Sequence, residues 1–472
     1  METDPPMKAL HELGARELAA HYARGALSPL DVAQAVMARI ERWEPRLHAL
    51  WAYAPEAVLA QARASEARWR AGRPLSALDG VPLTLKDNIA TQGLAVPLGT
   101  AASALVPATE DAPPAARLRE AGAVLLAKTT MPDYGMLSSG LSSFHALARN
   151  PWNLATNPGG SSAGAGAAAA AGYGPLHLGT DIGGSIRLPA AWCGVVGFKP
   201  SLGRVPIKPP YIGRVAGPMT RSVEDAAALM AVLAQPDWRD ATSLPPQAID
   251  WSALDCELRG LRIGLLLDAG WGLACAPEIG AAVTRAAQLF EQAGARVEPL
   301  APFTTRAMAD GIDLFWRVRS WLDIAALPHE RRERVLPFIR QWVEGGAHAS
   351  TAELFRGFSQ IAALRDAAVA ACQPFDFVLS PVAPLASFPA EHAMPTNDPA
   401  RAMEHIAFTL PYNMSEQPAI SVPCAHAADG APIGLQIAGR RHDDLGVLRL
   451  ARAWERLRPA EALRPWPEQP AA

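Results

Sequence analysis

The sequence predicts a single large α/β domain whose β-sheet is parallel at least in part. The first observation is a strand–helix–strand unit, in which apolar strands at 261–267 and 296–300 surround a helix at 277–292. Parallel strands joined by a helix are the repeating unit of α/β sheets. The second observation is that further strand-like runs are spread over most of the 472 residues without a long polar linker. Since every strand needs partners, one domain over 1–472 fits better than the three that length alone allows.

Caps, apolar periodicity and glycine stops place the elements in chain order. Ser28 and Pro29 begin a helix whose apolar residues recur at helical spacing as far as Ile40. An Ala-rich helix at 54–69 follows, and Asp79-Gly80 then turns the chain into a strand that ends at Lys86. Further along, we expect a helix at 113–121, strands at 123–127, 375–379, 419–422 and 433–438, and a closing helix at 444–457.

The composition is that of a core-forming protein. Half of the residues are apolar, 19% are charged, and the formal net charge is −3. Because there is no basic excess, nucleic acid is not expected as a direct ligand. The first ten residues lack the pattern of a secretory signal, and the weakly polar run at 163–171 is too short to span a bilayer. We therefore expect a cytoplasmic protein that does not bind membranes.

The cysteines and histidines show no metal-binding pattern. The five cysteines form no CxxC pair, no Cys/His cluster has zinc spacing, and the eleven histidines include no HExxH. We interpret the cysteines as buried thiols in a reducing compartment. We predict no metal and no other cofactor.

Two glycine-rich loops carry the residues best suited to chemistry. The loop at 157–166 contains Ser161 and Ser162, and the loop at 179–187 contains Ser185. Glycines let the backbone approach a ligand closely, and successive free N–H groups form an anion-binding concavity beside which a serine can act as a nucleophile. The alternative is a plain glycine turn in which Ser185 only caps a helix. The N–H groups that could hold the oxyanion are those of Ile182, Gly183, Gly184 and Ser185.

Lys86 is the candidate base. It ends an apolar run that includes Leu83 and Leu85. A lysine buried there has its charged form penalised, which lowers its pKa and provides a neutral amine. The alternative is a lysine that pairs with Asp87 or extends into solvent, as lysines usually do.

A different nucleophile is also conceivable. The residues Gly160 to Gly164 match the G-x-S-x-G nucleophile elbow, with Ser162 at its centre. That elbow needs a strand directly before it, and the Asn- and Pro-rich residues 150–158 do not suit a central strand. We therefore favour Ser185. The alternative for the serine pair is a role in hydrogen bonding within the loop and in capping the Ala-rich helix that follows.

Taken together, these segments resemble the amidase signature family of serine hydrolases, over about residues 10 to 458. The resemblance implies a mixed β-sheet flanked on both sides by helices, and a Ser–cis-Ser–Lys triad. In this sequence Ser185 would be the nucleophile, Ser161 the bridging serine and Lys86 the base, and Ala163 departs from the glycine common in the family. The motifs that carry the resemblance are Gly80–Asn88, Gly159–Ser162, Gly179–Arg187, Pro189–Ser201 and Gly434–Gly439. The resemblance further assigns substrate binding to Gly135, Met136 and Thr180.

The function implied is hydrolysis of the C–N bond of a small carboxylic amide through an acyl-enzyme. Esters, anilides and carbamates (urethanes) react along the same tetrahedral path. The segment 315–358, rich in Phe and Trp, is a candidate for an apolar substrate pocket or for ordinary helix core. The alternative is the amidase (glutaminase) subunit of a tRNA-dependent amidotransferase, although residues 202–213 depart from its pattern. The sequence does not fix the oligomeric state, and a homodimer is the assembly that we would test for.

Overall fold

The computed structural model describes residues 8–463 together with 466 and 467. The start of the chain at 1–7 and the C-terminal limit of the predicted domain lie outside the described residues. Within them, no helix is both long enough and apolar enough to cross a bilayer.

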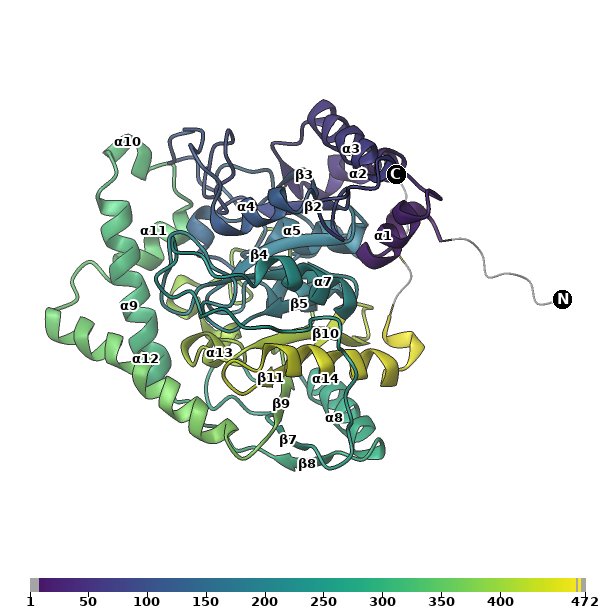
Figure 1. Ribbon diagram of the computed structural model, residues 1–472. Coiled ribbons are helices and arrows are strands. Elements are labelled where there is room, and N and C mark those ends of the chain that lie inside the picture. Colours follow the sequence, from purple (N-terminus) through teal and green to yellow (C-terminus); the bar gives the residue numbers. More distant parts are fainter. Residues whose placement is uncertain (1–7, 464–465, 468–472) are drawn as a thin grey trace.

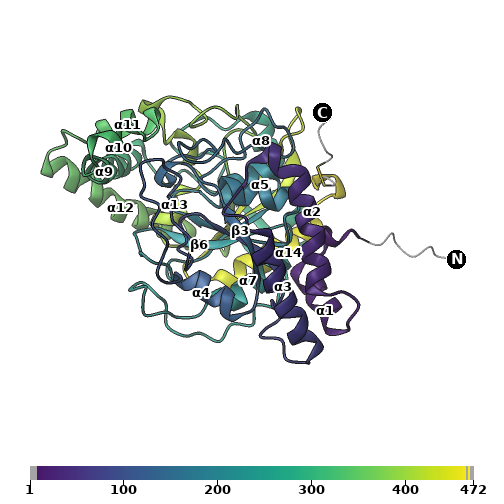
Figure 2. The same cartoon turned by 90° about the horizontal axis from the view of Figure 1, so that it is seen from above.

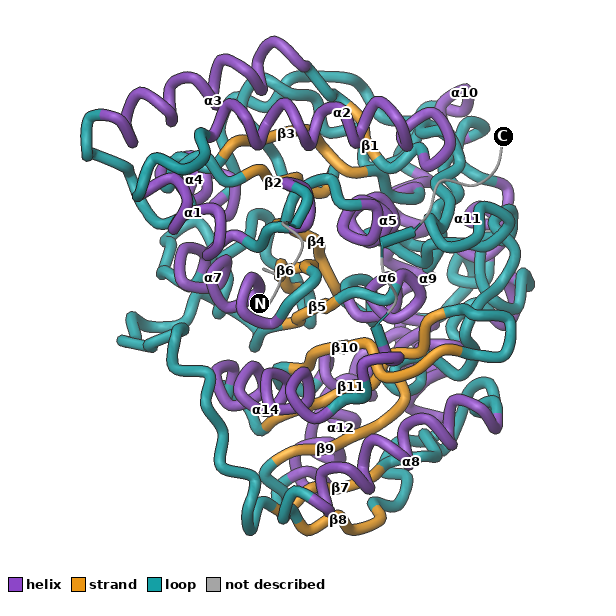
Figure 3. The backbone as a smooth tube through the Cα atoms, turned by 90° about the vertical axis from the view of Figure 1, so that its right-hand side faces the viewer, coloured by secondary structure: helices purple, strands orange, loops and turns teal. Residues whose placement is uncertain are grey.

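One mixed β-sheet runs through the whole molecule (Figures 1 and 3). The described residues contribute eleven strands to it, in the order β1-β3-β2-β4-β6-β5-β10-β11-β9-β7-β8. β2 is parallel to β3 and β4, and β7 is parallel to β8 and β9, whereas the other pairs are antiparallel. The strands are β1 Leu50–Trp51, β2 Pro82–Lys86, β3 Val124–Thr129, β4 Leu176–Asp181, β5 Val196–Lys199, β6 Val215–Thr220, β7 Arg262–Leu265, β8 Arg296–Pro299, β9 Phe377–Pro381, β10 Ala419–His426 and β11 Pro432–Gly439. The predicted strand–helix–strand unit is confirmed as β7, α8 and β8.

Helices cover both faces of the sheet, as predicted. α7 and α14 lie on one face, and α5 and α6 lie on the other (Figure 3). The helices are α1 Ala15–Ala23, α2 Pro29–Leu47, α3 Pro55–Arg70, α4 Pro113–Glu120, α5 Ala163–Ala171, α6 Arg187–Cys193, α7 Val223–Leu233, α8 Pro277–Gln292, α9 Arg306–Ala325, α10 His329–Arg332, α11 Pro337–Glu344, α12 Thr351–Cys372, α13 Leu410–Met414 and α14 Asp444–Leu457. Short 3₁₀ turns are η1 Leu10–Glu12, η2 Asp133–Gly135, η3 Pro399–Arg401, η4 Glu404–Ile406 and η5 Ala460–Ala462.

Two local signals behave as the sequence predicts. The Ser28 hydroxyl accepts a hydrogen bond from the Asp31 N–H at 3.1 Å and so caps α2. Ala163 begins α5 at a position whose φ is not positive, so alanine is accommodated there without strain.

The cysteines are buried only in part, whereas the sequence predicts that all five are. Cys256 and Cys275 are half-buried, and the other three are buried.

A second hydrophobic cluster lies beside the main core and includes residues of the helices α9, α11 and α12. These helices lie together at one side of the molecule, away from α1 to α3 (Figures 1 and 2). Ile312 and Trp316 of α9 and Ile339 and Trp342 of α11 belong to this cluster, which also includes Trp192 of α6. Through Trp192, the cluster connects these helices to the part of the molecule that contains the glycine-rich loops.

Candidate active site

Lys86 lies at the end of β2 and is completely buried. Its Nζ lies within hydrogen-bond distance of three hydroxyl groups: 2.8 Å from Ser161 Oγ, 3.0 Å from Ser162 Oγ and 3.1 Å from Thr180 Oγ1. Asp87 is turned away, because its carboxylate accepts from backbone N–H groups of the next loop and lies 2.8 Å from His145 Nε2. The alternative of a lysine that pairs with Asp87 or reaches solvent is therefore wrong.

The environment of Lys86 favours its neutral form. Burial is the main cause, and the positive charge of Arg214 adds to it; together they hold the pKa of Lys86 well below that of an ordinary lysine. Asp181 and Asp87 act in the opposite direction without outweighing them. A neutral amine within 2.8 Å of a serine hydroxyl is placed to act as a base.

The two neighbouring serines differ in what surrounds them. The Gly160–Ser161 peptide bond is cis, and Ser161 lines the central cavity. Ser162 is fully buried, and its hydroxyl donates to the Thr180 carbonyl oxygen at 3.1 Å. Residues 150–162 contain isolated bridges but no strand, so the nucleophile elbow on Ser162 lacks the element that it needs.

Ser185 lies in the loop between β4 and α6 and lines the same cavity as Ser161. Its carbonyl oxygen accepts from the Ser162 N–H at 3.1 Å, which fixes the two glycine-rich loops to each other. The first turn of α6 is preceded by Ile186 as its cap, and no side chain makes a capping bond there. The alternative in which Ser185 only caps the helix is therefore wrong.

The predicted oxyanion donors need one correction. The Gly184 N–H donates to Asp181 Oδ1 at 2.7 Å and so is not available to a ligand. Within the described part of the chain, the N–H groups of Ile182, Gly183 and Ser185 make no hydrogen bond. These three N–H groups are the remaining candidates to donate hydrogen bonds to a negatively charged oxygen.

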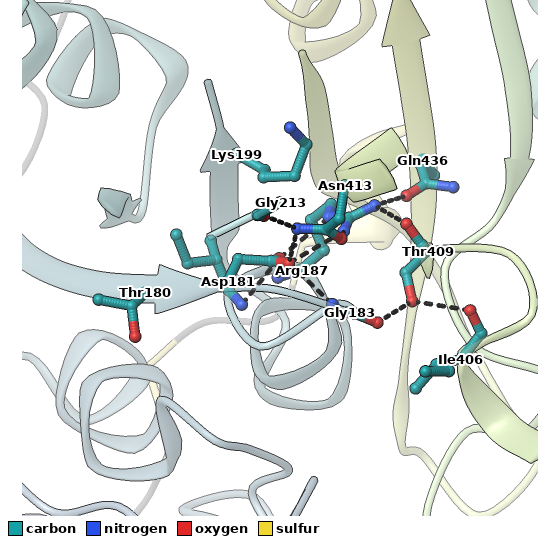
Figure 4. A network of polar contacts seen from close by, with 12 residues as sticks. Thr180, Asp181, Gly183, Arg187, Lys199, Gly213, Ile406, Thr409, Asn413 and Gln436 are labelled. Atoms are coloured by element: carbon teal, nitrogen blue, oxygen red, sulfur yellow. Dashed lines mark hydrogen bonds and ion pairs between the residues drawn. The ribbon is translucent and has the colours of Figure 1, made fainter. Parts of the chain in front are cut away.

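A buried ionic network beneath this loop was not recognised from the sequence (Figure 4). Arg187 Nη2 lies 3.0 Å from Asp181 Oδ1, and both side chains are inaccessible to solvent. Arg187 Nη1 donates to Gln436 Oε1 at 2.8 Å and to the Thr409 carbonyl oxygen at 2.9 Å. Asn413 donates to Asp181 Oδ1 at 2.9 Å. Although burial alone would raise the pKa of Asp181, the Arg187 charge lowers it, so the carboxylate stays ionised and holds the loop.

The central cavity has a volume of about 560 Å³ and walls that are mainly apolar. All three residues predicted to bind substrate line it, namely Gly135, Met136 and Thr180. Gly135 has a φ of +70°, and a Cβ there would lie 3.2 Å from Ser161 Oγ. The cavity is also lined by residues that sequence reasoning missed, including Tyr134, Tyr211, Arg214, Arg319, Met394, Met403 and Ile406. Asp181 and Arg187 had a local signal, since both lie in the serine motif, whereas the missed lining residues had none.

The aromatic segment at 315–358 divides between several roles. Trp316 and Trp342 line the cavity, and a Cβ built on Gly183 would lie 3.4 Å from the Trp316 ring. Phe355 and Phe358 of α12 are exposed, by 70% and 43%. Two tryptophans of the segment therefore line the cavity, whereas these two phenylalanines do not, and a role of the tryptophans in substrate binding stays a prediction.

Comparison with known proteins agrees with the motifs. The family model described as Amidase matches residues 31–448. The chain is 37% identical to a glutamyl-tRNA(Gln) amidotransferase subunit of Myxococcus xanthus, covering 95% of this chain and 97% of that protein. It is 35% identical to an acylamidase of Rhodococcus erythropolis, covering 98% and 97%.

Solved structures of amide hydrolases share the fold. A bacterial aryl acylamidase of the amidase signature family has a TM-score of 0.88 at 30% identity, covering 95% of this chain and 97% of that one. The peptide amidase of Stenotrophomonas maltophilia has a TM-score of 0.81 at 27% identity, covering 98% and 99%. With the family model matched over most of its length, this chain belongs to the amidase signature family and is an amide hydrolase.

Proposed function

We propose that this protein is a self-sufficient amidohydrolase that cleaves small carboxylic amides through an acyl-enzyme on Ser185. The observation that carries the proposal is the contact between buried Lys86 and Ser161 at one wall of the cavity that Ser185 also lines. Lys86 takes up the Ser161 proton as Ser161 takes up the Ser185 proton, and Ser185 Oγ then bonds to the substrate carbonyl carbon. The carbonyl electron pair moves onto the carbonyl oxygen. The free N–H groups of the 182–185 loop donate hydrogen bonds to the oxyanion that forms.

The tetrahedral intermediate then collapses and its C–N bond breaks. The proton held by Lys86 returns through Ser161 to the leaving nitrogen, which departs as the neutral amine or ammonia. Water next adds to the acyl carbon and gives its proton to the same relay. The C–O bond to Ser185 breaks, the carboxylic acid leaves, and Ser185 regains its proton. Every group is restored, so the cycle needs no co-reactant other than water.

The apolar walls of the cavity support an aryl or alkyl substrate. Trp316 and Ile406 lie against Gly183, next to the proposed oxyanion donors. Burial of one aromatic ring against such walls contributes about 1.5–3 kcal/mol. We propose anilides and alkyl amides as substrates, with esters and carbamates as weaker ones. A cytoplasmic location and a homodimer stay predictions from the sequence.

A second candidate is favoured by one observation, the 37% identity to a component of an amidotransferase. Such a component would release ammonia from glutamine for use by partner proteins. An assay of the isolated chain after gel filtration distinguishes the two. The self-sufficient enzyme hydrolyses 4-nitroacetanilide at a rate well above its rate on glutamine. Glutamine turnover without anilide turnover would support the amidotransferase role instead.

Labelling identifies the nucleophile in the same preparation. A fluorophosphonate should modify Ser185, as located by peptide mapping, and Ser185→Ala should remove both the label and the activity. Ser162→Ala is the matched control, and its protein should keep the label. A label on Ser162 would contradict the proposed mechanism.

A further inference from the structure

Arg214 is a cation of the cavity wall that has no carboxylate partner within the described residues. It comes immediately before β6, and because Val215 pairs with Asp181, Arg214 lies opposite the start of the loop that carries Ser185. Its Nη1 donates to the Pro209 carbonyl oxygen at 3.3 Å. Across residues 8–463, 466 and 467, no Asp or Glu lies within ion-pair distance of its guanidinium. By contrast, the buried Arg187 and Arg204 are each paired with an aspartate.

Arg214 is half-buried in the cavity wall and keeps its charge. Burial and the nearby Arg319 lower the pKa of Arg214 to about 10, which leaves it protonated at neutral pH. A half-buried charge has lost part of its hydration, and without a partner carboxylate the protein does not replace what was lost. A ligand that supplies a negative charge would replace it.

The other charged groups on the cavity wall do not provide a negative charge to balance Arg214. Arg319 stacks on the Tyr211 ring at 4.5 Å and has Asp323 3.6 Å away. Lys208 is paired with Glu110 at 2.5 Å. Asp181 is neutralised by Arg187 beneath the loop. The cavity is therefore apolar with a net positive charge, and a low-dielectric wall strengthens the attraction of such a charge for an anion.

We propose that Arg214 binds a carboxylate of the substrate, so that the preferred substrates are amides that carry a carboxylate group. The inference rests on the proposed function, because it concerns the same cavity and the same nucleophile. The guanidinium group offers a planar pair of N–H donors that matches the two oxygens of a carboxylate. Arg214 lines the cavity together with Ser161, Thr180 and Ser185, so one substrate molecule can place a carboxylate at Arg214 and its amide at Ser185.

Two matched substrate pairs test which end of the amide carries the carboxylate. On the acyl side, succinic acid mono-4-nitroanilide is compared with 4-oxopentanoyl 4-nitroanilide, in which a methyl ketone replaces the carboxylate. On the amine side, 4-acetamidobenzoate is compared with 4-acetamidoacetophenone. We expect kcat/KM of the wild-type enzyme to favour the carboxylate member of at least one pair by about tenfold to a hundredfold, as for a charged hydrogen bond.

Variants of the arginine separate binding from other roles. At a pH above the acidic limb of kcat/KM, where Lys86 is neutral in every variant, Arg214→Met should remove the preference and keep most of the rate on the neutral member. Arg214→Lys should keep part of the preference. Arg331→Met, at an exposed arginine of α10 that does not line the cavity, should keep it in full. Thermal unfolding and fluorophosphonate labelling of Ser185 show that each variant is folded with a competent nucleophile.

Three outcomes would overturn the inference. The first is a wild-type enzyme that labels on Ser185 and hydrolyses neutral anilides without any preference; the proposed function then stands alone. The second is an Arg214→Met enzyme that loses rate equally on both members while the acidic limb of kcat/KM moves to higher pH. That result would mean that Arg214 acts only on the proton affinity of Lys86. The third outcome is a wild-type enzyme that neither labels on Ser185 nor hydrolyses any amide. This outcome would contradict the proposed function as well.

Discussion

At the scale of single residues, Lys86 can act as a base only because it can lose its proton. Arginine stays protonated and offers no lone pair. Lys86→Arg and Lys86→Ala should therefore both lose most of the amide hydrolysis, by about 10²–10⁴-fold for a missing general base. Alanine should retain more activity on esters, whose leaving group needs less protonation. Steady-state kinetics with circular dichroism as the folding control checks this, and near-normal amide turnover by Lys86→Arg would contradict the mechanism.

The depressed pKa of Lys86 also predicts two pH dependences. The kcat/KM of the wild type should rise with pH along an acidic limb that lies well below the usual lysine value of about 10.4. The folded state binds fewer protons than the unfolded state between the two pKa values of this lysine, so in that window stability rises with pH. Relative to Lys86→Met, the wild-type free energy of unfolding should therefore increase by up to about 1.4 kcal/mol per pH unit. Urea titrations of both proteins from pH 6 to 9 measure it, and a pH-independent difference would show an ordinary lysine.

Gly135 is predicted to be needed for activity more than for stability. A methyl group there would lie 3.2 Å from Ser161 Oγ, and its φ of +70° disfavours a side chain. Gly135→Ala should displace the bridging hydroxyl and lower kcat by at least about tenfold, since small misplacements of catalytic groups cost up to about 10²-fold. Gly72→Ala is the control, because Gly72 has a φ of +65° with no atom within 4 Å of the added carbon. Both variants should lose similar stability, and equal kcat values would contradict the prediction.

At the scale of elements, the Asp181–Arg187 pair joins the end of β4 to the start of α6. Asp181→Asn leaves the buried Arg187 charge without its counter-ion, which should cost about 3–5 kcal/mol of unfolding free energy. The control is Glu17→Gln, which breaks the exposed Lys8–Glu17 pair and should cost no more than about 1 kcal/mol. Denaturant unfolding measures both. A loss below about 1 kcal/mol in Asp181→Asn would mean that the network does not hold the loop.

Elements with strong local signals were predictable from the sequence, and those without were not. Pro and Gly delimit α8, and the prediction of 277–292 is confirmed at both ends. β6 was missed because it contains Gly217 and Pro218, which disfavour a strand, yet Pro218 pairs opposite Leu178 within the sheet. The helices α9 to α12 were seen only as an aromatic-rich segment, because their apolar residues face both a core and a cavity.

The same distinction holds for the candidate site. Lys86, Ser161 and Ser185 lie in motifs whose residue order indicates their chemistry. Arg214 and Met403 have no such signal, since they reach the cavity from segments far apart in the sequence. Arg214 is distinguished by its place in the cavity wall and by the lack of a counter-ion among the described residues, and both are properties of the packed molecule alone.

At the scale of the whole molecule, activity should not depend on a metal ion. The described residues include no group of three or more His, Cys, Asp or Glu side chains that could hold one. Exhaustive dialysis against a chelator should therefore leave kcat unchanged, as measured by anilide hydrolysis before and after. A large loss that zinc restores would contradict this prediction.

In the sheet, the two C-terminal strands β10 and β11 lie between β5 and β9. The sheet therefore cannot be completed until the last part of the chain has been synthesised. A ribosome has already polymerised Lys86, Ser161 and Ser185 long before Gln436 of β11 emerges to contact Arg187. At about 5–20 residues per second, that interval lasts roughly ten to fifty seconds. During this time the nascent chain has every proposed catalytic side chain but lacks the contacts from Thr409, Asn413 and Gln436 that hold the loop. We therefore expect hydrolytic capacity to be acquired near the end of translation, and a chain that ends before Gln436 to lack it.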